Sequence, residues 1–144
     1  MPGLTAPVLI RPARSSELPD VLDLWGRARS AAASTPDTLE LLATLLRSTD
    51  SALLVALVDD GLAGTLIVAW DGWRGHMYRL AVTPELRRRG IGAALLEAGH
   101  AHLAARGATR VDAIVVRGDE VAAALWVASG YELQEGVERY VRSI

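Results

Sequence analysis

Between residues 52 and 82 the chain carries three apolar stretches that only short turns separate. The stretches are Leu53–Val58, Ala63–Trp70 and His76–Val82, and the turns are Asp59-Asp60-Gly61 and Asp71–Gly75. Apolar runs bounded by Asp and Gly are typical of buried strands. Connections this short join antiparallel neighbours. The segment therefore predicts an antiparallel meander at the centre of the fold.

After Thr83-Pro84 the apolar period changes from strand to helix. Apolar residues recur at helical spacing from Ile91 until Arg106-Gly107, a cation followed by a glycine that is typical of a helix C-terminus. Val111–Val116 then reads as a strand. A strand, a helix and a strand in this order form a right-handed crossover, so the last two strands should be parallel.

Two helices are expected before the meander. Val8–Arg11 is a short β-like run, after which Ser16 can cap an amphipathic helix that ends near Ala32. Thr35-Pro36 repeats the pattern of a cap followed by proline and predicts a second, shorter helix. Both helices precede the sheet.

The C-terminal part is predicted to hold one more helix and a final pair of strands. Asp119 can cap a helix through Ser129, and the strands are expected at Tyr131–Gln134 and Glu138–Arg142. The whole chain is therefore expected to be one α+β domain over residues 1–144. Its mixed, mostly antiparallel central sheet of six to seven strands should have about four helices on both faces.

Composition excludes several classes of protein. The chain has no cysteine, which removes disulfides, thiolate nucleophiles and Cys-based metal sites. His100 and His102 point in different directions on a helix, so we expect no metal site. The net charge of −2 favours neither nucleic acid nor a membrane surface. No signal peptide or spanning segment is apparent, and we expect a cytoplasmic protein.

The turn from Arg87 to Gly92 lies where the predicted strand gives way to the helix. A helix N-terminus offers unpaired N–H groups and a partial positive charge, and Gly90 and Gly92 let an anion approach the backbone. The pattern fits a polyphosphate held by backbone amides. Taken alone, it fits a solvated basic helix start equally well. Neither a P-loop nor the third glycine of a dinucleotide fingerprint is present.

The context of this turn resembles a known family. Leu80–Glu85, Arg87-x-x-Gly90-x-Gly92 and Leu95-Leu96 together resemble the acyl-CoA signature of the GNAT acetyltransferase superfamily. Further similarities are the opening Ile10–Ala13, the Gly61/Gly64 hairpin, and Ala122-x-x-Leu125-Trp126-x-x-x-Gly130-Tyr131. The resemblance extends over nearly the whole chain.

The resemblance implies an N-acetyltransferase with acetyl-CoA as co-substrate. The backbone of Arg88–Ala93 would bind the CoA pyrophosphate, and the backbone of Leu80 and Val82 would pair with the pantetheine arm between two splayed strands. The Leu80 amide would donate to the thioester oxygen. The residues so implied in cofactor binding are Leu80, Ala81, Val82, Arg87, Arg88, Arg89, Gly90, Ile91, Gly92, Ala93, Asp119 and Trp126.

Two residues are candidates for proton transfer. His76 aligns with a glutamate that serves as base in relatives, and an imidazole suits neutral pH. Trp126 stands where the family often has a tyrosine that acts as the general acid. An indole N–H can donate a hydrogen bond to sulfur while water supplies the proton. A structural role is an alternative for each, with His76 a histidine at a strand start and Trp126 a packing residue.

The family builds its acceptor pocket from the first two helices, their connection and the loops near the third and last strands, which implies Trp25, Trp73 and Tyr78 as acceptor-side residues. The helical spacing of Trp25 favours the core instead, and Trp73 in its glycine-flanked turn is expected to be exposed. The expected function is acetyl transfer to a primary amine of a small molecule or protein by direct attack in a ternary complex. The alternative is a non-catalytic acyl-CoA-binding sensor of the same fold. An edge strand at Glu138–Arg142 would allow a homodimer.

Overall fold

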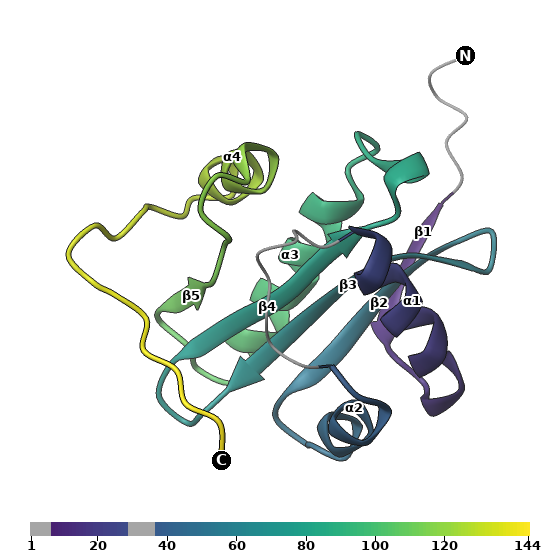
Figure 1. Cartoon of the computed structure of the whole chain (residues 1–144), viewed down its shortest axis with the longest axis horizontal. Helices are drawn as coiled ribbons and strands as arrows, with labels where there is room; N and C mark the ends of the chain where they lie inside the picture. The colour runs from purple at the N-terminus through teal and green to yellow at the C-terminus, as the bar shows by residue number, and fades with distance from the viewer. Residues whose placement is uncertain (1–6, 29–36) are drawn as a thin grey trace.

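The sheet has five strands among the residues that the structure describes, 7–28 and 37–144 of a computed structural model (Figure 1). Their spatial order equals their order in the chain. The first four pair antiparallel, and the last pairs parallel to its neighbour. The strands are β1 (Val8–Pro12), β2 (Ala52–Val58), β3 (Gly61–Trp70), β4 (Gly75–Val82) and β5 (Val111–Ala113).

The predicted meander and crossover are confirmed. Strands β2, β3 and β4 are consecutive neighbours, and helix α3 (Ile91–Ala104) leads from β4 to the parallel strand β5. In the β2–β3 turn, Asp59 and Asp60 both have positive φ, 51° and 64°. Two left-handed residues give a turn whose twist matches that of the flanking strands. The turn thereby fixes the hairpin that sets the register of the sheet.

Helices cover both faces of the sheet, as predicted. Helices α1 (Leu18–Ala28) and α2 (Leu39–Leu46) pack on one face, and α3 packs on the other with α4 (Glu120–Ala128) beyond it (Figure 1). Each face has its own apolar core. The first contains Leu18, Val21, Leu24, Trp25, Leu42, Leu53, Val55, Leu57 and Ala81. The second contains Leu54, Ala56, Ala63, Leu66, Val68, Met77, Ile91, Leu95, Leu96, Leu103 and Trp126.

The helix starts differ in part from those expected. A short 3₁₀ segment (Ser15–Glu17) precedes α1, and the Glu17 carboxylate accepts a hydrogen bond from the backbone N–H of Arg14 at 2.8 Å. Thr38 caps α2 by accepting from the Leu41 N–H at 3.1 Å. The predicted helix end near Ala32 and the predicted start at Thr35-Pro36 lie outside the described residues.

The sheet is shorter at its last edge than predicted. Strand β5 ends at Ala113 instead of Val116, and the expected strands Tyr131–Gln134 and Glu138–Arg142 are not formed. The C-terminal segment instead leaves α4 and passes outside β5 (Figure 1). Side chains such as Leu133 and Tyr140 are exposed, so no buried face fixes a strand register there. A homodimer paired through this segment stays a prediction.

Gly64 provides a test of how closely β3, β4 and α3 pack. A Cβ atom at Gly64 would lie 2.9 Å from the backbone oxygen of Ala81 and 3.0 Å from Leu95 Cδ1, and a backbone oxygen cannot move aside cheaply. We expect Gly64→Ala to lower the free energy of unfolding by about 1–3 kcal/mol in urea titrations. Gly61→Ala is the matched control in the same strand, because its Cβ would meet only an ordinary contact at 3.4 Å. Equal stability of the two variants would contradict this packing.

Candidate active site

Strand β4 carries a β-bulge. Two of its residues, Arg79 and Leu80, lie opposite the single residue Leu66 of β3. Arg79 has a φ of +56°, in the left-handed region that residues other than glycine seldom adopt. A bulge changes the direction of the backbone groups that follow it. The segment predicted to meet acyl-CoA, Leu80–Val82, therefore begins at the bulge.

Strands β4 and β5 pair over a short length only. Gly75–Met77 pairs with Val111–Ala113, and β5 ends there while β4 continues to Val82 (Figure 1). The outer edge of β4 from Tyr78 onward therefore has no β5 ladder beside it. The predicted separation of the two strands is present, and Leu80 lies in the separated part.

The turn before α3 has the backbone geometry of an anion site. Arg88 and Gly90 have φ of +66° and +79°, so the chain passes twice through the left-handed region in three residues. Gly90 is the N-cap of α3 and no side chain caps the helix. The first bond into the helix runs from Ala94 N–H to Gly90 oxygen at 3.0 Å. The amides of Ile91, Gly92 and Ala93 consequently have no acceptor within the helix.

The surroundings of these amides suit a polyphosphate. Arg87, Arg88, Arg89 and Gly90 are exposed, and the first turn of α3 contains no acidic residue. The partial positive charge of the helix N-terminus adds to that of the guanidinium groups. We call this segment, Arg87–Ala93, the cradle; its residues follow one another from the turn into the first turn of α3.

Gly92 has a packing role in addition to its place in the cradle. A Cβ atom there would lie 2.8 Å from Leu125 Cδ2, so the glycine allows α4 to approach α3. At Gly90, in contrast, nothing lies within 4 Å of the corresponding position. A large side chain at Gly92 would disturb α4 as well as the cradle. Gly90 is therefore the cleaner position at which to test anion binding.

Trp126 and Asp119 both lie on α4. Trp126 is 6% exposed within the core and packs edge-on against Tyr131, with ring centroids 4.9 Å apart. Asp119 caps α4, as predicted, by accepting from the Ala122 N–H at 3.1 Å. The Tyr131 hydroxyl lies 2.6 Å from His100 Nε2, and burial raises its pKa to about 12. Tyr131 accordingly does not ionise at neutral pH.

His76 is held between two carboxylates. Its Nε2 lies 2.9 Å from Asp71 and its Nδ1 lies 2.9 Å from Asp112, so the ring ties β4 to β5 and to the β3–β4 turn. The hydrogen bond to Asp71, with that to Asp112, raises the pKa of His76 above its ordinary value of 6.5. The pKa of Asp71 falls to about 2, mainly because its carboxylate accepts the Arg74 backbone N–H and then the His76 ring N–H. Both carboxylates can accept from the ring only when the imidazole carries two protons, so the arrangement favours the protonated form.

The three aromatic residues predicted for the acceptor side lie in different environments. Trp25 is 1% exposed and belongs to the core of the α1–α2 face, so it offers no accessible ring. Trp73 is 70% exposed in the β3–β4 turn, with the Arg74 guanidinium 4.1 Å from its ring centroid. Tyr78 is half-buried beside His76, with ring centroids 6.4 Å apart. Tyr78 and Trp73 are thus the accessible members of the group.

Sequence reasoning missed the polar partners of these residues. Asp71 and Asp112 are 41 positions apart in the chain, and no spacing rule brings them to one histidine. Thr65 is a second example, because it looks like an ordinary strand residue and is completely buried. The parallel pairing of β4 with β5, which was predicted, is the only signal that could have brought Asp112 near His76.

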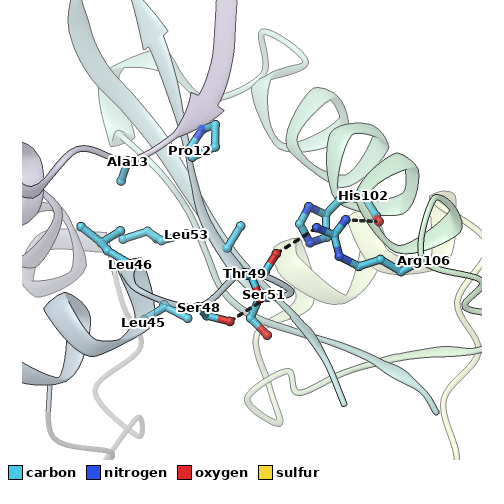
Figure 2. Close-up of a pocket in the computed structure, with 11 residues that line it drawn as sticks. Pro12, Ala13, Leu45, Leu46, Ser48, Thr49, Ser51, Leu53, His102 and Arg106 are labelled. Carbon is cyan, nitrogen blue, oxygen red and sulfur yellow. Dashed lines mark hydrogen bonds between the residues drawn. The ribbon is translucent and has the colours of Figure 1, made fainter. Parts of the chain in front are cut away.

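A surface pocket of about 310 Å³ lies at the other end of α3 (Figure 2). His102 and Arg106 line one side, where Arg106 donates to the Thr49 backbone oxygen at 3.1 Å. The opposite side is lined by Leu45, Leu46 and Leu53. A helix of 14 residues is roughly 20 Å long, so the pocket is separate from the cradle.

Within residues 7–28 and 37–144, no group of three acidic or histidine side chains converges as a metal site would require. The two carboxylates beside His76 bind opposite nitrogens of the ring. The same ranges contain no helix of the length and apolarity that a bilayer span needs.

Solved structures of similar fold include three aminoglycoside acetyltransferases. AAC(6')-Iy in complex with CoA has 18% identity and a TM-score of 0.78, over 99% of both chains. AAC(6')-Ih from Acinetobacter baumannii has 20% identity and a TM-score of 0.76, over 96% of this chain and 99% of that one. An aminoglycoside acetyltransferase from an uncultured soil metagenomic sample, in complex with sisomicin, has 22% identity and a TM-score of 0.71, over 95% of this chain and 96% of that one. These likenesses show the fold.

A family model decides the assignment. The model described as the acetyltransferase (GNAT) family matches residues 18–131, from the start of α1 to Tyr131, just beyond the end of α4. That range includes the bulge, the separated strands and the cradle. The chain belongs to the GNAT acetyltransferase family.

Proposed function

We propose that acetyl-CoA binds with its pyrophosphate on the amides of Arg88–Ala93 and its pantetheine arm along the outer edge of β4. The observation that carries this proposal is that uncapped helix amides and an unpaired strand edge lie consecutively in the chain. An extended pantetheine can hydrogen-bond to Leu80 and Val82 as an added strand would. Asp119 uses one carboxylate oxygen to cap α4, which leaves the other for a pantetheine amide.

The proposed reaction is direct transfer to a primary amine. The neutral amine nitrogen attacks the thioester carbon, the new C–N bond forms, the C–S bond breaks, and CoA leaves as a thiolate. The Leu80 N–H donates to the carbonyl oxygen as negative charge develops there, and one such donor typically lowers a barrier by about 2.7–4 kcal/mol. The amine loses one proton and the thiolate gains one.

His76 remains our candidate for accepting the amine proton, with a condition set by its contacts. It must first lose a proton and release Asp71, whose side chain is 48% exposed on a turn. The base would therefore act in its neutral form, above its raised pKa. On the leaving side, a free thiol has a pKa near 8.5, so a thiolate needs little acid help. Trp126 would at most donate a hydrogen bond to sulfur.

The acceptor is proposed to be a cationic amine. Asp71 and Asp112 lie beside Tyr78, and both carboxylates are about half exposed. Negative charge there favours a molecule with several ammonium groups. The three similar structures named above are aminoglycoside acetyltransferases, so aminoglycosides are the first class to test, followed by polyamines and peptide N-termini.

Turnover separates the enzyme from the alternative, an acyl-CoA sensor. The assay is release of free CoA thiol from acetyl-CoA with each amine class in turn. We expect release that depends on one amine class. Tight binding of acetyl-CoA by calorimetry without thiol release for any amine would favour the sensor and contradict the transferase.

A negative charge placed in the cradle should weaken donor binding. Gly90→Asp sets a carboxylate where the phosphates would lie, in open space, and we expect acetyl-CoA affinity to fall by more than about tenfold, or 1.4 kcal/mol. Gly90→Asn carries the same backbone strain without the charge and should lose less. Gly107→Asp is the control for strain, because Gly107 also has a positive φ and open surroundings but lies beyond the other end of α3. Unchanged affinity of Gly90→Asp would refute the cradle.

The pH profile of kcat/KM tests His76. Activity that needs neutral His76 is lost as pH falls through its pKa, which lies above 6.5. Asp71→Asn removes the largest cause of the raised pKa of His76 and keeps an acceptor for the Arg74 N–H. We therefore expect the acidic limb of the profile, where activity is lost as pH falls, to move to lower pH. Asp112→Asn should move it in the same direction. A limb that stays in place in His76→Ala would exclude this residue as the base.

Low pH should remove activity but preserve the stability that His76 contributes. Because the folded pKa of His76 is raised, its contribution is complete below 6.5 and is lost as pH rises through the folded value. The pKa of Asp71 is lowered to about 2, so its contribution is present above 3.8 and is lost as pH falls through about 2. The other charged groups near the ring are Asp112 and, through Tyr78, Arg139. His76→Ala should therefore cost more stability at pH 6 than at pH 9 in urea titrations.

A further inference from the structure

Thr65 is the one buried polar or charged side chain in the described part of the chain. Its hydroxyl accepts a hydrogen bond from Trp25 Nε1 at 2.7 Å and donates one to the backbone oxygen of Arg79 at 2.9 Å. Trp25 is itself 1% exposed. A buried hydroxyl with both roles filled holds its partners in fixed directions. Helix α1, strand β3 and the bulge of β4 thus meet at one oxygen atom.

The bulge needs to be held. A left-handed backbone at a residue other than glycine is strained and persists only where its surroundings fix it. The side chain of Arg79 is fixed as well as its carbonyl. Its Nη2 lies 2.8 Å from Asp37 Oδ1, and its guanidinium lies 5.5 Å from the centroid of the Trp25 ring. Trp25 therefore supports Arg79 in two ways, through its ring and through Thr65.

The carbonyl of Arg79 determines where the next amide points. The Arg79 carbonyl and the Leu80 N–H belong to one planar peptide unit, and the chain has no cis peptide bond in its described residues. In a trans peptide the C=O and N–H directions are opposite. Because the oxygen points to Thr65 on β3, the Leu80 N–H points away from β3. That direction is toward the part of the β4 edge that β5 leaves free.

We propose that Thr65 and Trp25 are positioning residues for acetyl transfer, which aim the Leu80 N–H at the thioester oxygen by holding the Arg79 carbonyl. The inference rests on the proposed function, in which Leu80 is the donor. It also gives Trp25 a role through the bulge rather than through contact with the acceptor. Neither residue touches the reacting atoms.

The main variant is Thr65→Val, which keeps the shape of the side chain and removes the hydroxyl. We expect kcat to fall by roughly tenfold or more while KM for acetyl-CoA stays within about twofold, because the cradle and the β4 edge remain. Thr65→Ser restores the hydroxyl and should recover most of kcat. Trp25→Phe removes the Nε1–H together with part of the ring that faces Arg79, and it should also lower kcat.

A matched control separates positioning from general destabilisation. Val55 is the cross-strand partner of Thr65 and is fully buried in the same core. Val55→Ala should lower stability without lowering kcat, because it removes packing and leaves the three hydrogen-bonded groups in place. If Val55→Ala lowers kcat as much as Thr65→Val, the positioning role is wrong.

A second readout needs no turnover. The infrared stretch of the thioester carbonyl, observed with ¹³C-labelled acetyl-CoA, moves to lower frequency when the oxygen accepts a hydrogen bond. We expect this shift in the wild type and its loss in Thr65→Val. An unchanged stretch in Thr65→Val, with unchanged kcat, would overturn the inference and leave the proposed function intact. If the wild type bound no acetyl-CoA, the proposed function would fail and the inference with it.

Discussion

The hydrogen bond from Thr65 to the Arg79 carbonyl is the contact on which the geometry of the site depends. The bond joins the core beneath α1 and α2 to β4, the strand whose outer edge is left free where β5 ends. Without support the bulge would relax toward a regular ladder, because the left-handed backbone of Arg79 is strained. The buried hydroxyl holds the carbonyl of the bulge, and Asp37 holds the side chain of Arg79. The apolar core around Trp25 in turn excludes the water that would compete for that bond.

The two ends of the site use different kinds of interaction. At the helix start, the proposed recognition of the donor uses backbone amides and the open space at Gly90. At the end of β4 near β5, it comes from side chains, where His76 lies between Asp71 and Asp112. The first kind needs only a conformation and depends little on which residue provides it. The second kind depends on residue identity and on contacts between distant parts of the chain.

This difference explains how far the sequence could be interpreted. The meander, the crossover helix and the glycine turn at the start of α3 were predictable, because each leaves a local pattern of apolar spacing, turn residues or glycines. The last two strands were not, because Tyr131–Gln134 and Glu138–Arg142 alternate like strands but bury nothing that would fix them. Thr65 gave no signal, since a threonine in a strand is ordinary until its burial is known. The carboxylates beside His76 were hidden for a related reason, namely their distance along the chain.

The same reasoning bears on what the family assignment can transfer. The proposed donor binding through backbone amides depends on backbone conformation, and a fold is shared at about a fifth of identical residues with other acetyltransferases. Acceptor choice depends on side chains such as Tyr78 and the neighbouring carboxylates, which a shared fold does not fix. The negative charge of Asp71 and Asp112 also favours the protonated form of His76. A substrate that brings its own ammonium group to Asp71 would compete for the carboxylate that holds the ring, and would thereby free the nitrogen that the reaction needs.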